Sequence, residues 1–464
     1  MHQPIRTCCM VGQWLTRHVT RFAIAWKTKF KKPNMGKGKL VVNGYTAPGF
    51  EKVRETFKAN LESGLDQGGS FAVFYHGEPV VNLWGGYSDY DCRRMWKEDT
   101  LSTFYSSTKA VAAFVIAHLV DRGLLDYQKP VSRYWPEFAQ KGKGAVTVEQ
   151  LISNQAGLIT LDQPFWLSEL RDDPVKLGRK LAEQEPFWKP GEKHGYHPLT
   201  FGLYLDQVVR HADPQHRSLA QYFNDEIAKP FDIEMYIILP KNLNHRAARV
   251  RLARPYTRDD YAVEHGQHFK GDMALFQATN DKTALDFKTT LKMNDPDIRE
   301  LPCPSTHGHA TAANMAKLFG IVANGGTKDG KALLSQEATE RFTKPLVAGI
   351  DCSFGMDAAW SVGTHLITMV TGSQPPNHIF GHGGYGGQYA ACDIRHKIGF
   401  AYTTCFLDPF TSYSDNGDER MYSLVNVMYQ CVFDKENMKQ EWRLFPFHSK
   451  FKSYMDQNQM TSKL

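Results

Sequence analysis

The sequence of 464 residues lacks the features that mark several large classes of protein. No stretch approaches the ~18 consecutive apolar residues of a membrane-spanning helix. None of the eight cysteines forms a Cys-x-x-Cys pair, so zinc-ribbon and thioredoxin-like motifs are absent. A Gly-x-Ser-x-Gly sequence, which marks the nucleophile of α/β-hydrolases, does not occur either. No signal peptide is visible, and we therefore predict an intracellular protein with reduced thiols.

Acidic residues are missing from the first 50 positions, which hold nine lysines and arginines. The remainder carries 46 basic and 49 acidic residues, so the net charge of +6 belongs to an N-terminal extension, residues 1–47. The nearly neutral remainder gives no reason to expect a nucleic-acid partner. Apolar residues recur at helical spacing in the extension, which predicts membrane-surface contact through residues 12–32 or a mitochondrial targeting sequence. A disordered basic tail is the alternative, and the absence of serine from these 50 residues argues against targeting.

The composition, 42% hydrophobic and 22% charged, is typical of a globular protein with a sizeable core. Strand patterns occur near both ends of the chain and helical patterns fill most of the middle. This distribution predicts an α/β (α+β) fold, in which one antiparallel sheet built from both chain ends is flanked by helices and an inserted subdomain is mostly helical. We place this domain at residues 48–433 and a loosely attached tail at 434–464. The expected helices are 48–68, 147–154, 199–211, 218–228, 310–324 and 419–432, and the expected strands are 70–75, 79–84, 366–371, 388–394 and 398–405, with an irregular excursion at 250–300.

The chain is organised around Ser106 and Lys109. The apolar run 110–117 follows them, which predicts one helix buried on every side. Residues three apart share a helix face, so the serine and the lysine would meet at the first turn. A lysine in a dry site loses part of its preference for the charged form and would activate the serine as a nucleophile. Two fixed residues are a weak motif on their own, because a second Ser-x-x-Lys stands in the polar tail at Ser449 and Lys452.

Two further stretches carry residues with chemical potential. A turn-rich loop presents Tyr196 just before a predicted helix, and a positive neighbour such as Lys109 would favour its phenolate and let it take the serine proton. The alternative is a tyrosine that only packs its ring. Five glycines occur among residues 381–387, around His382 and Tyr385. They indicate close backbone approach or positive φ, either to present N–H groups and His382 to a substrate or only to form a hairpin.

Histidines raise a separate metal hypothesis. A zinc site would have to be assembled from His307, His309, His378 and His382. The His-x-His pair lacks the acidic and histidine partners of a metallohydrolase motif, so we expect neither a metal nor a cofactor.

Together and in this order, these stretches resemble the serine β-lactamase and penicillin-binding-protein superfamily, and most closely class C β-lactamase-like proteins and the related family VIII type esterases. The resemblance spans about residues 48–433. Its carriers are Ser106-Ser107-Thr108-Lys109, residues 151–158, Trp188-x-Pro190-Gly191 leading to Tyr196, residues 305–311, and His382-Gly383-Gly384.

The resemblance implies that Ser106 is acylated while Lys109 and Tyr196 share the proton work. It also implies an oxyanion hole made of the backbone N–H groups of Ser106 and Tyr385. The further substrate-binding positions that it implies are Gly383, Gly384 and His382.

Two departures from the family pattern concern the recognition of antibiotics. Pro198 stands where class C enzymes have the asparagine of Tyr-x-Asn, and it offers no side-chain amide. His382-Gly383-Gly384 replaces Lys-Thr-Gly, so a fixed positive charge for the β-lactam carboxylate is lost. Both changes leave the acylation machinery intact.

We therefore predict a serine hydrolase that acts on a small ester or peptide-like amide through an acyl-enzyme, esterase-like rather than antibiotic-degrading. The alternative is a catalytically inactive member, a scaffold that forms oligomers or associates with a membrane through its basic extension. We expect a cytoplasmic or mitochondrial protein with peripheral membrane association, and a homo-oligomer is compatible with either function.

Overall fold

The fold was taken from a computed structural model of the chain. It describes residues 41–253, 271–279, 284–287, 290–355, 357–372, 374–408, 417–445 and 451–453. The segment 12–32, for which we predict membrane contact or targeting, lies outside these residues, as does Ser449 of the second Ser-x-x-Lys.

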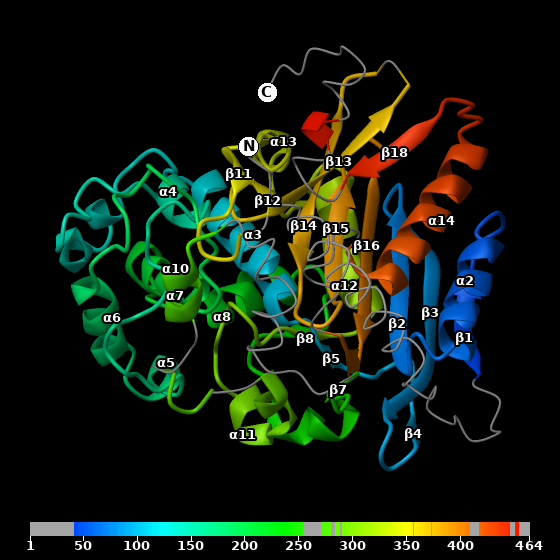
Figure 1. Cartoon of the computed structure of the whole chain (residues 1–464), viewed down its shortest axis with the longest axis horizontal. Coiled ribbons are helices and arrows are strands. Elements are labelled where there is room, and N and C mark those ends of the chain that lie inside the picture. The colour runs from blue at the N-terminus through cyan, green and yellow to red at the C-terminus, as the bar shows by residue number, and fades with distance from the viewer. Residues whose placement is uncertain are drawn as a thin grey trace, which may run out of the picture.

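A sheet of 11 strands in the described part of the chain forms the centre of the molecule (Figure 1). Its main path runs β1-β3-β2-β16-β15-β14-β13-β12-β11, with β4 paired to β3 and β18 to β13. Every pairing in it is antiparallel. The strands are β1 (Val42–Thr46), β2 (Gly68–Tyr75), β3 (Glu78–Asp89), β4 (Arg94–Met95), β11 (Val347–Ile350), β12 (Asp357–Trp360), β13 (His365–Thr371), β14 (Asn377–Gly383), β15 (Tyr389–Asp393), β16 (Ile398–Thr404) and β18 (Trp442–Phe445).

The two ends of the chain meet where β2 pairs with β16, from Tyr75 opposite Ile398 to Gly69 opposite Thr404. This register joins strands more than 300 positions apart in the sequence. The structure therefore confirms the predicted sheet assembled from both ends of the chain.

Strands β2 and β16 lie between two hydrophobic cores, and their successive side chains alternate between the two. Phe71 and Phe400 belong to the core under helices α2 (Glu51–Glu62) and α14 (Glu419–Lys435), whereas the small Ala72 faces the opposite side. On that opposite side a Cβ on Gly399 of β16 would collide with the backbone of helix α12 (Ala312–Ala323), so the helix packs directly on the strand. Successive residues of a strand point to opposite faces, so the neighbouring Phe71 and Ala72 contribute to different cores. In Figure 1, α2 and α14 lie along the sheet on the side of β1 to β3.

The predicted helical subdomain lies between β5 and β8 in the sequence. In space it lies beside the end of the sheet that is opposite β1 (Figure 1). The helices of this region are α3 (Thr108–Asp121), α4 (Val148–Ile152), α5 (Glu169–Asp172), α6 (Pro174–Glu183), α7 (Thr200–Ala212), α8 (Leu219–Tyr222), α10 (Met273–Ala278) and α11 (Pro296–Arg299), with a π-helix at Phe223–Ala228. They are mostly short, and four of them, α4, α6, α8 and α11, begin at a side-chain cap; Thr147, the cap of α4, forms a capping box with Gln150.

Small paired strands and one further helix complete the described elements. Strand β8 (His309–Ala310) lies between β5 (Ser102–Thr103) and β6 (Met235–Tyr236), so it brings the 305–311 stretch beside the segment that leads into α3. The others are β7 (Arg251–Leu252) with β17 (Phe406–Leu407), β9 (Thr327–Lys328) with β10 (Lys331–Ala332), and helix α13 (Gln336–Arg341).

The sheet is larger than the sequence pattern predicts. Strand β1 falls within the segment that we placed in the N-terminal extension, and β18 falls within the predicted tail. Strand β3 also runs through Gly85 and Gly86, where we expected the hairpin to end, because both glycines pair with β2. Strands β11, β12 and β14 were not expected, since they are short, polar or interrupted by glycine.

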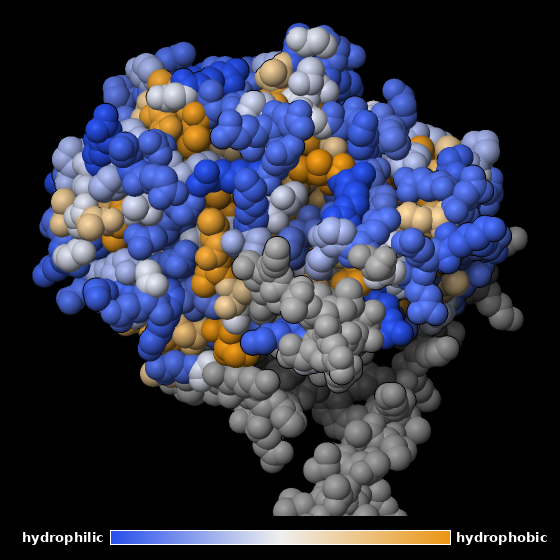
Figure 2. Space-filling view, turned by 90° about the horizontal axis from the view of Figure 1, so that it is seen from above, coloured by the Kyte–Doolittle hydropathy of each residue, from blue (hydrophilic) through white to orange (hydrophobic). Residues whose placement is uncertain are grey.

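Apolar side chains at the surface are scattered. Figure 2 shows a mostly hydrophilic face with separate small apolar patches. Among the described residues, no helix is long and apolar enough to cross a membrane.

Candidate active site

Ser106 lies in a single 3-10 turn, Tyr105–Ser107, that leads directly into α3. The sequence pattern placed it inside the helix, and the structure places it just before the helix. Tyr105 has a φ of 45°, in the left-handed region that a tyrosine rarely adopts. Ser106 is partly exposed although its neighbours Tyr105 and Ser107 are buried. The turn therefore presents one serine side chain from an otherwise closed surface, and backbone strain of this kind concentrates at functional sites.

Lys109 sits one turn below Ser106 and is fully buried. Its Nζ lies 3.1 Å from Ser106 Oγ and donates a hydrogen bond of 3.0 Å to the carbonyl oxygen of Ser305. Ser305 is itself fixed, because its Oγ donates to the Leu199 carbonyl at 2.6 Å and accepts from the Gly202 N–H at 2.7 Å. The predicted contact between the serine and the lysine is present, and a second segment of the chain orients the amine.

Tyr196 approaches Ser106 from the other side. Its hydroxyl is hydrogen-bonded to the Ser106 side chain, and Lys109 Nζ lies 5.1 Å from the centre of its ring. The ring stacks on Trp360 with centroids 5.7 Å apart and an interplanar angle of 8°. Ser106, Lys109 and Tyr196, predicted from three separate motifs, therefore meet at one point.

Main-chain hydrogen bonds hold the Tyr196 loop in place. The Tyr196 N–H donates to Oδ2 of the fully buried Asp351 at 2.6 Å. The neighbouring His197 N–H donates to Asn154 Oδ1 at 3.2 Å, and the Leu158 N–H donates to His197 Nε2 at 2.8 Å. The 151–158 stretch that carries the family resemblance thus forms the cradle of the tyrosine loop.

The electrostatics of Tyr196 differ from the expectation based on sequence. Burial raises the pKa of Tyr196 well above its usual value, the hydrogen bond to Ser106 lowers it, and the charge of Asp351 raises it further. The neutral phenol, and not the predicted phenolate, is therefore the resting form of this side chain.

His382 lies at the end of β14, beside the stacked rings of Tyr196 and Trp360, with centroids 5.7 and 5.6 Å away. Its Nδ1 is 2.6 Å from the Gly383 carbonyl oxygen, so this nitrogen carries the proton and donates. Its Nε2 is buried and has no hydrogen-bond partner among the described residues. Burial, together with the nearby charge of Lys109, holds the pKa of His382 well below its usual range. The imidazole is therefore neutral and offers one acceptor nitrogen to the site.

The glycine turn after β14 packs against the turn that carries Ser106. A Cβ on Gly384 would collide with the carbonyl oxygen of Phe104, two residues before Ser106. The rings of Tyr105 and Tyr385 lie 5.8 Å apart. Gly383 ends the strand beside His382. The predicted oxyanion residues Ser106 and Tyr385 thus belong to two turns in direct contact.

The four histidines of the metal hypothesis, which we did not favour, have separate hydrogen-bond partners. His307 Nδ1 pairs with Thr306 Oγ1 at 2.8 Å, and His309 Nδ1 with the His307 carbonyl oxygen at 2.8 Å. His378 Nδ1 contacts Thr368 Oγ1 at 3.2 Å. Within the described ranges, no group of three or more His, Cys, Asp or Glu side chains is arranged to hold a metal ion.

Sequence analysis missed three residues of this site. Ser305 was noted only as part of a motif, and Asp351 and Trp360 were not singled out. The carbonyl of Ser305 acts through its main chain, which carries no residue-specific signal. Asp351 directly follows β11 and Trp360 is the last residue of β12, and nothing in their spacing links them to Tyr196.

Comparisons with known proteins identify the family of this chain. The model of the family described as Beta-lactamase matches residues 53–418. The esterase/beta-lactamase LipL of Mycobacterium tuberculosis is 29% identical over 376 residues, which are 78% of this chain and 82% of LipL. A solved family VIII carboxylesterase superposes with a TM-score of 0.73 at 34% identity, over 84% of this chain and 100% of the other. A penicillin-binding protein homolog from Caulobacter crescentus superposes with a TM-score of 0.70 at 31% identity, over 84% and 100% of the two chains.

The family match covers well over half of the sequence, and the carboxylesterase is covered over its whole length. These matches confirm the fold class and the family resemblance predicted from the motifs. The chain therefore belongs to the beta-lactamase family and is a serine hydrolase.

Proposed function

We propose that the protein hydrolyses small neutral esters through an acyl-enzyme on Ser106. The observation that carries the proposal is the position of Ser106 Oγ, which lies 3.1 Å from Lys109 Nζ and is also hydrogen-bonded to Tyr196. A serine hydroxyl needs a base within hydrogen-bond reach, and a leaving group needs a proton donor. Lys109 and Tyr196 supply these two groups on either side of one oxygen.

The proton path follows from the ionisation of the tyrosine. With Lys109 in its unprotonated form, Ser106 Oγ forms a bond to the ester carbonyl carbon while the serine proton passes to Lys109 Nζ. Burial keeps Tyr196 a neutral phenol, so its hydroxyl gives a proton to the departing alkoxide and regains one from Lys109. Water then attacks the acyl-enzyme by the reverse path, in which its proton enters the Lys109–Tyr196 pair and returns to Ser106 as the acid leaves. No net charge accumulates on the enzyme over the cycle.

Charge develops on the carbonyl oxygen during both steps. We assign its stabilisation to the main-chain N–H groups of Ser106 and Tyr385, because the two turns that carry them are in contact. A donor of this kind typically lowers the barrier by about 3 kcal/mol. Gly384 has no side chain, which lets its turn contact the Phe104 carbonyl beside Ser106.

The substrate class follows from what faces the nucleophile. A β-lactam carries a carboxylate, whereas the group at the position of the family lysine is the neutral His382. Pro198 offers no amide, and aromatic rings of Tyr196 and Trp360 line the remainder. An uncharged ester satisfies such a site without leaving a carboxylate unpaired in a dry environment. The solved family VIII carboxylesterase and LipL, whose names include esterase, are consistent with this choice.

Covalent labelling tests the proposal directly. A fluorophosphonate probe is expected to label the full-length wild-type protein at Ser106 and to give no adduct with Ser106→Ala. Ser107→Ala is the matched control, because Ser107 is the adjacent serine but is buried, and it should label normally. Whatever turnover the wild type shows on a panel of short-chain esters, nitrocefin and D-amino-acid peptides should be lost in Ser106→Ala and kept in Ser107→Ala. Folded wild-type protein that does not label would identify an inactive member of the family, and equal labelling of Ser106→Ala would assign the reactive nucleophile to another residue.

Substituting the histidine tests the substrate class. His382→Lys places an ammonium where the neutral imidazole lies, and a charge-assisted hydrogen bond to a carboxylate contributes roughly 1.5–3 kcal/mol. We expect the ratio of kcat/KM for nitrocefin to that for a neutral short-chain ester to rise by about 10-fold or more, on the basis of that range. His382→Gln, which stays neutral, should not raise the ratio. An equal ratio in wild type and His382→Lys would contradict the role given to His382.

A further inference from the structure

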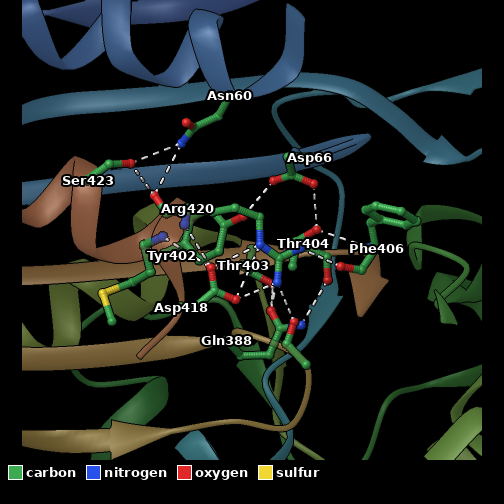
Figure 3. Close-up of polar contacts among 12 residues, drawn as sticks. Asn60, Asp66, Gln388, Tyr402, Thr403, Thr404, Phe406, Asp418, Arg420 and Ser423 are labelled. Atoms are coloured by element: carbon green, nitrogen blue, oxygen red, sulfur yellow. Dashed lines mark hydrogen bonds and ion pairs between the residues drawn. The ribbon is translucent and has the colours of Figure 1, made fainter. Parts of the chain in front are cut away.

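A buried arginine lies directly behind the glycine turn that carries the Tyr385 N–H group. Arg420 is 2% exposed, at the first turn of α14, and its partner Asp418, the N-cap of that helix, is 5% exposed. Figure 3 shows the two side chains at the centre of a network of polar groups that joins the helix to the sheet. None of these residues belongs to the motifs that revealed the site.

The guanidinium of Arg420 is bound on three sides. Nη2 donates to the carbonyl oxygen of Gly386 at 2.7 Å, and Nη1 donates to that of Phe406 at 2.5 Å. Nε donates to Asp418 Oδ1 at 2.9 Å, and Nη2 is also paired with Oδ2 of the same carboxylate. A planar fork with several fixed donors can make these contacts at once, which a lysine ammonium cannot do.

The Gly386 carbonyl is connected mechanically to the Tyr385 N–H group. A peptide group is planar and trans, so the Gly386 carbonyl and the Gly387 N–H share one plane and point in opposite directions. The Gly387 N–H donates to the Gly384 carbonyl at 3.2 Å. The Gly384 carbonyl in turn shares its plane with the Tyr385 N–H. Fixing the first plane therefore fixes the second, and with it the direction in which the Tyr385 N–H points.

The turn has little freedom to compensate if this support is lost. Gly386 and Gly387 have φ values of 80° and 112°, which only glycine adopts readily. A Cβ on Gly387 would collide with Asp418 and Arg420, so the ion pair fills the space behind the turn. On the front, Gly384 is in contact with the Phe104 carbonyl. The turn is clamped between the ion pair and the turn that carries Ser106.

Stability alone gives a weak reason for this arrangement. Burying an ion pair costs desolvation energy, and replacing such a pair with apolar residues is often neutral or stabilising. The ion pair instead fixes the orientation of two main-chain carbonyl groups, those of Gly386 and Phe406. The second layer of the network joins β16 to the segment before β2, because Tyr402 donates to Asp66 at 2.5 Å and the Thr404 hydroxyl donates to the same carboxylate at 2.8 Å.

We propose that Arg420, held by Asp418, is a positioning residue for the oxyanion hole: it fixes the Gly386 carbonyl and thereby aims the Tyr385 N–H at the reacting carbonyl oxygen. This inference rests on the proposed acyl transfer at Ser106. It assigns the arginine no contact with the substrate.

The test compares an ester with its thiono analogue, in which sulfur replaces the carbonyl oxygen. Sulfur accepts hydrogen bonds weakly, so the ratio of kcat/KM for the oxygen ester to that for the thiono ester reports on the oxyanion donors. In Arg420→Lys we expect kcat for the oxygen ester to fall about 10- to 100-fold with little change in KM, as on weakening one donor. The thiono ester should lose much less, so the ratio should fall about 10-fold.

Tyr402→Phe is the matched control. It removes the hydrogen bond to Asp66 from the same network without touching the turn, so its melting temperature should fall while the ratio stays at the wild-type value. Asp418→Asn is the second variant, because asparagine still caps α14 but no longer binds the guanidinium as an ion. If Arg420→Lys does not fold, Asp418→Asn decides the question.

Two results separate this inference from the proposed function. Wild-type protein without labelling and turnover would overturn the proposed function. Wild-type turnover together with an unchanged ratio in folded Arg420→Lys or Asp418→Asn would overturn only the role of Arg420. An equal fall of the ratio in Tyr402→Phe would also overturn it, because it would assign the effect to the network as a whole.

Discussion

Replacing Lys109 with methionine is expected to lower kcat/KM for a short-chain ester on the order of 10³- to 10⁴-fold. Methionine has nearly the same length and fits the buried position, but it has no amine to take the proton of Ser106. The loss corresponds to about 4–5.5 kcal/mol of transition-state stabilisation. Most of this loss should appear in kcat, because Lys109 is buried beneath Ser106 and acts on the proton of its hydroxyl. Steady-state kinetics together with a thermal melt would measure both effects.

A second buried lysine provides the control for this substitution. Lys143 is also fully buried, and it donates to the carbonyl oxygens of Ala182 and Gln184 at 2.8 and 2.6 Å. Lys143→Met therefore removes an equally buried amine from two main-chain acceptors away from Ser106. It should lower the melting temperature and leave kcat/KM within about 3-fold of wild type, the range of context effects on single contacts. If Lys109→Met kept a tenth or more of the wild-type kcat, Lys109 would not be the base.

Acid is expected to unfold the protein well above the pH at which its carboxylates are protonated. His118, His197 and His307 are 0 or 1% exposed, and burial lowers the pKa of each to about 3 from a usual 6.5. The folded state thus keeps these rings neutral, while the unfolded chain takes up protons below pH 6.5. Stability is therefore fully present above about pH 6.5 and falls as the pH is lowered toward 3.

The size of this effect follows from the two pKa values. Between pH 7 and pH 5, each of the three histidines lowers the free energy of unfolding by about 2 kcal/mol. Their sum of about 6 kcal/mol is comparable with the 5–15 kcal/mol that stabilises a typical protein. Urea unfolding at a series of pH values, followed by circular dichroism, would measure the loss.

Single substitutions can measure the contribution of each histidine to this pH dependence. His118 Nδ1 lies 2.9 Å from the Tyr222 hydroxyl, and an amide can replace that contact. His118→Gln should reduce the loss between pH 7 and pH 5 by about 2 kcal/mol, its own share. His216→Gln, at an exposed position, should not change the loss. A stability that is constant from pH 7 to pH 5 would contradict the neutral state of these buried rings.

The sequence predicted the parts of the structure that local periodicity determines. The apolar run after Lys109 predicted a fully buried helix, and α3 is buried along nearly its whole length. The spacing of Ser106 and Lys109 predicted their contact, because three residues make about one helical turn. The alternating or apolar runs of β2, β15 and β16 predicted strands near both ends of the chain. The fold class followed from this order of elements.

Elements with weak local patterns were not predicted. Strand β14 is interrupted by glycine and carries histidines, so its pattern indicated a loop followed by a strand edge, yet its pairing with β13 and β15 makes it part of the sheet. Strands β1 and β18 are assigned by their partners, β3 and β13. A short strand is stabilised by the strand beside it, and the sequence of the strand alone does not contain that neighbour.

The chemistry of the site divides in the same way. The sequence by itself determined the candidates for the nucleophile, its lysine, the tyrosine and the glycine turn, since each belongs to a motif of fixed spacing. Only the tertiary structure decided what surrounds them: the Ser305 carbonyl, 196 positions from Lys109, the Asp351 carboxylate, 155 positions from Tyr196, and the Arg420 side chain behind the turn. It also reversed the expected direction of the Tyr196 pKa. The motifs led us to expect Lys109 near Tyr196, and a positive neighbour lowers the pKa of a tyrosine. Desolvation raises that pKa, and its size depends on every segment packed around the Tyr196 ring, which is known only from the folded chain.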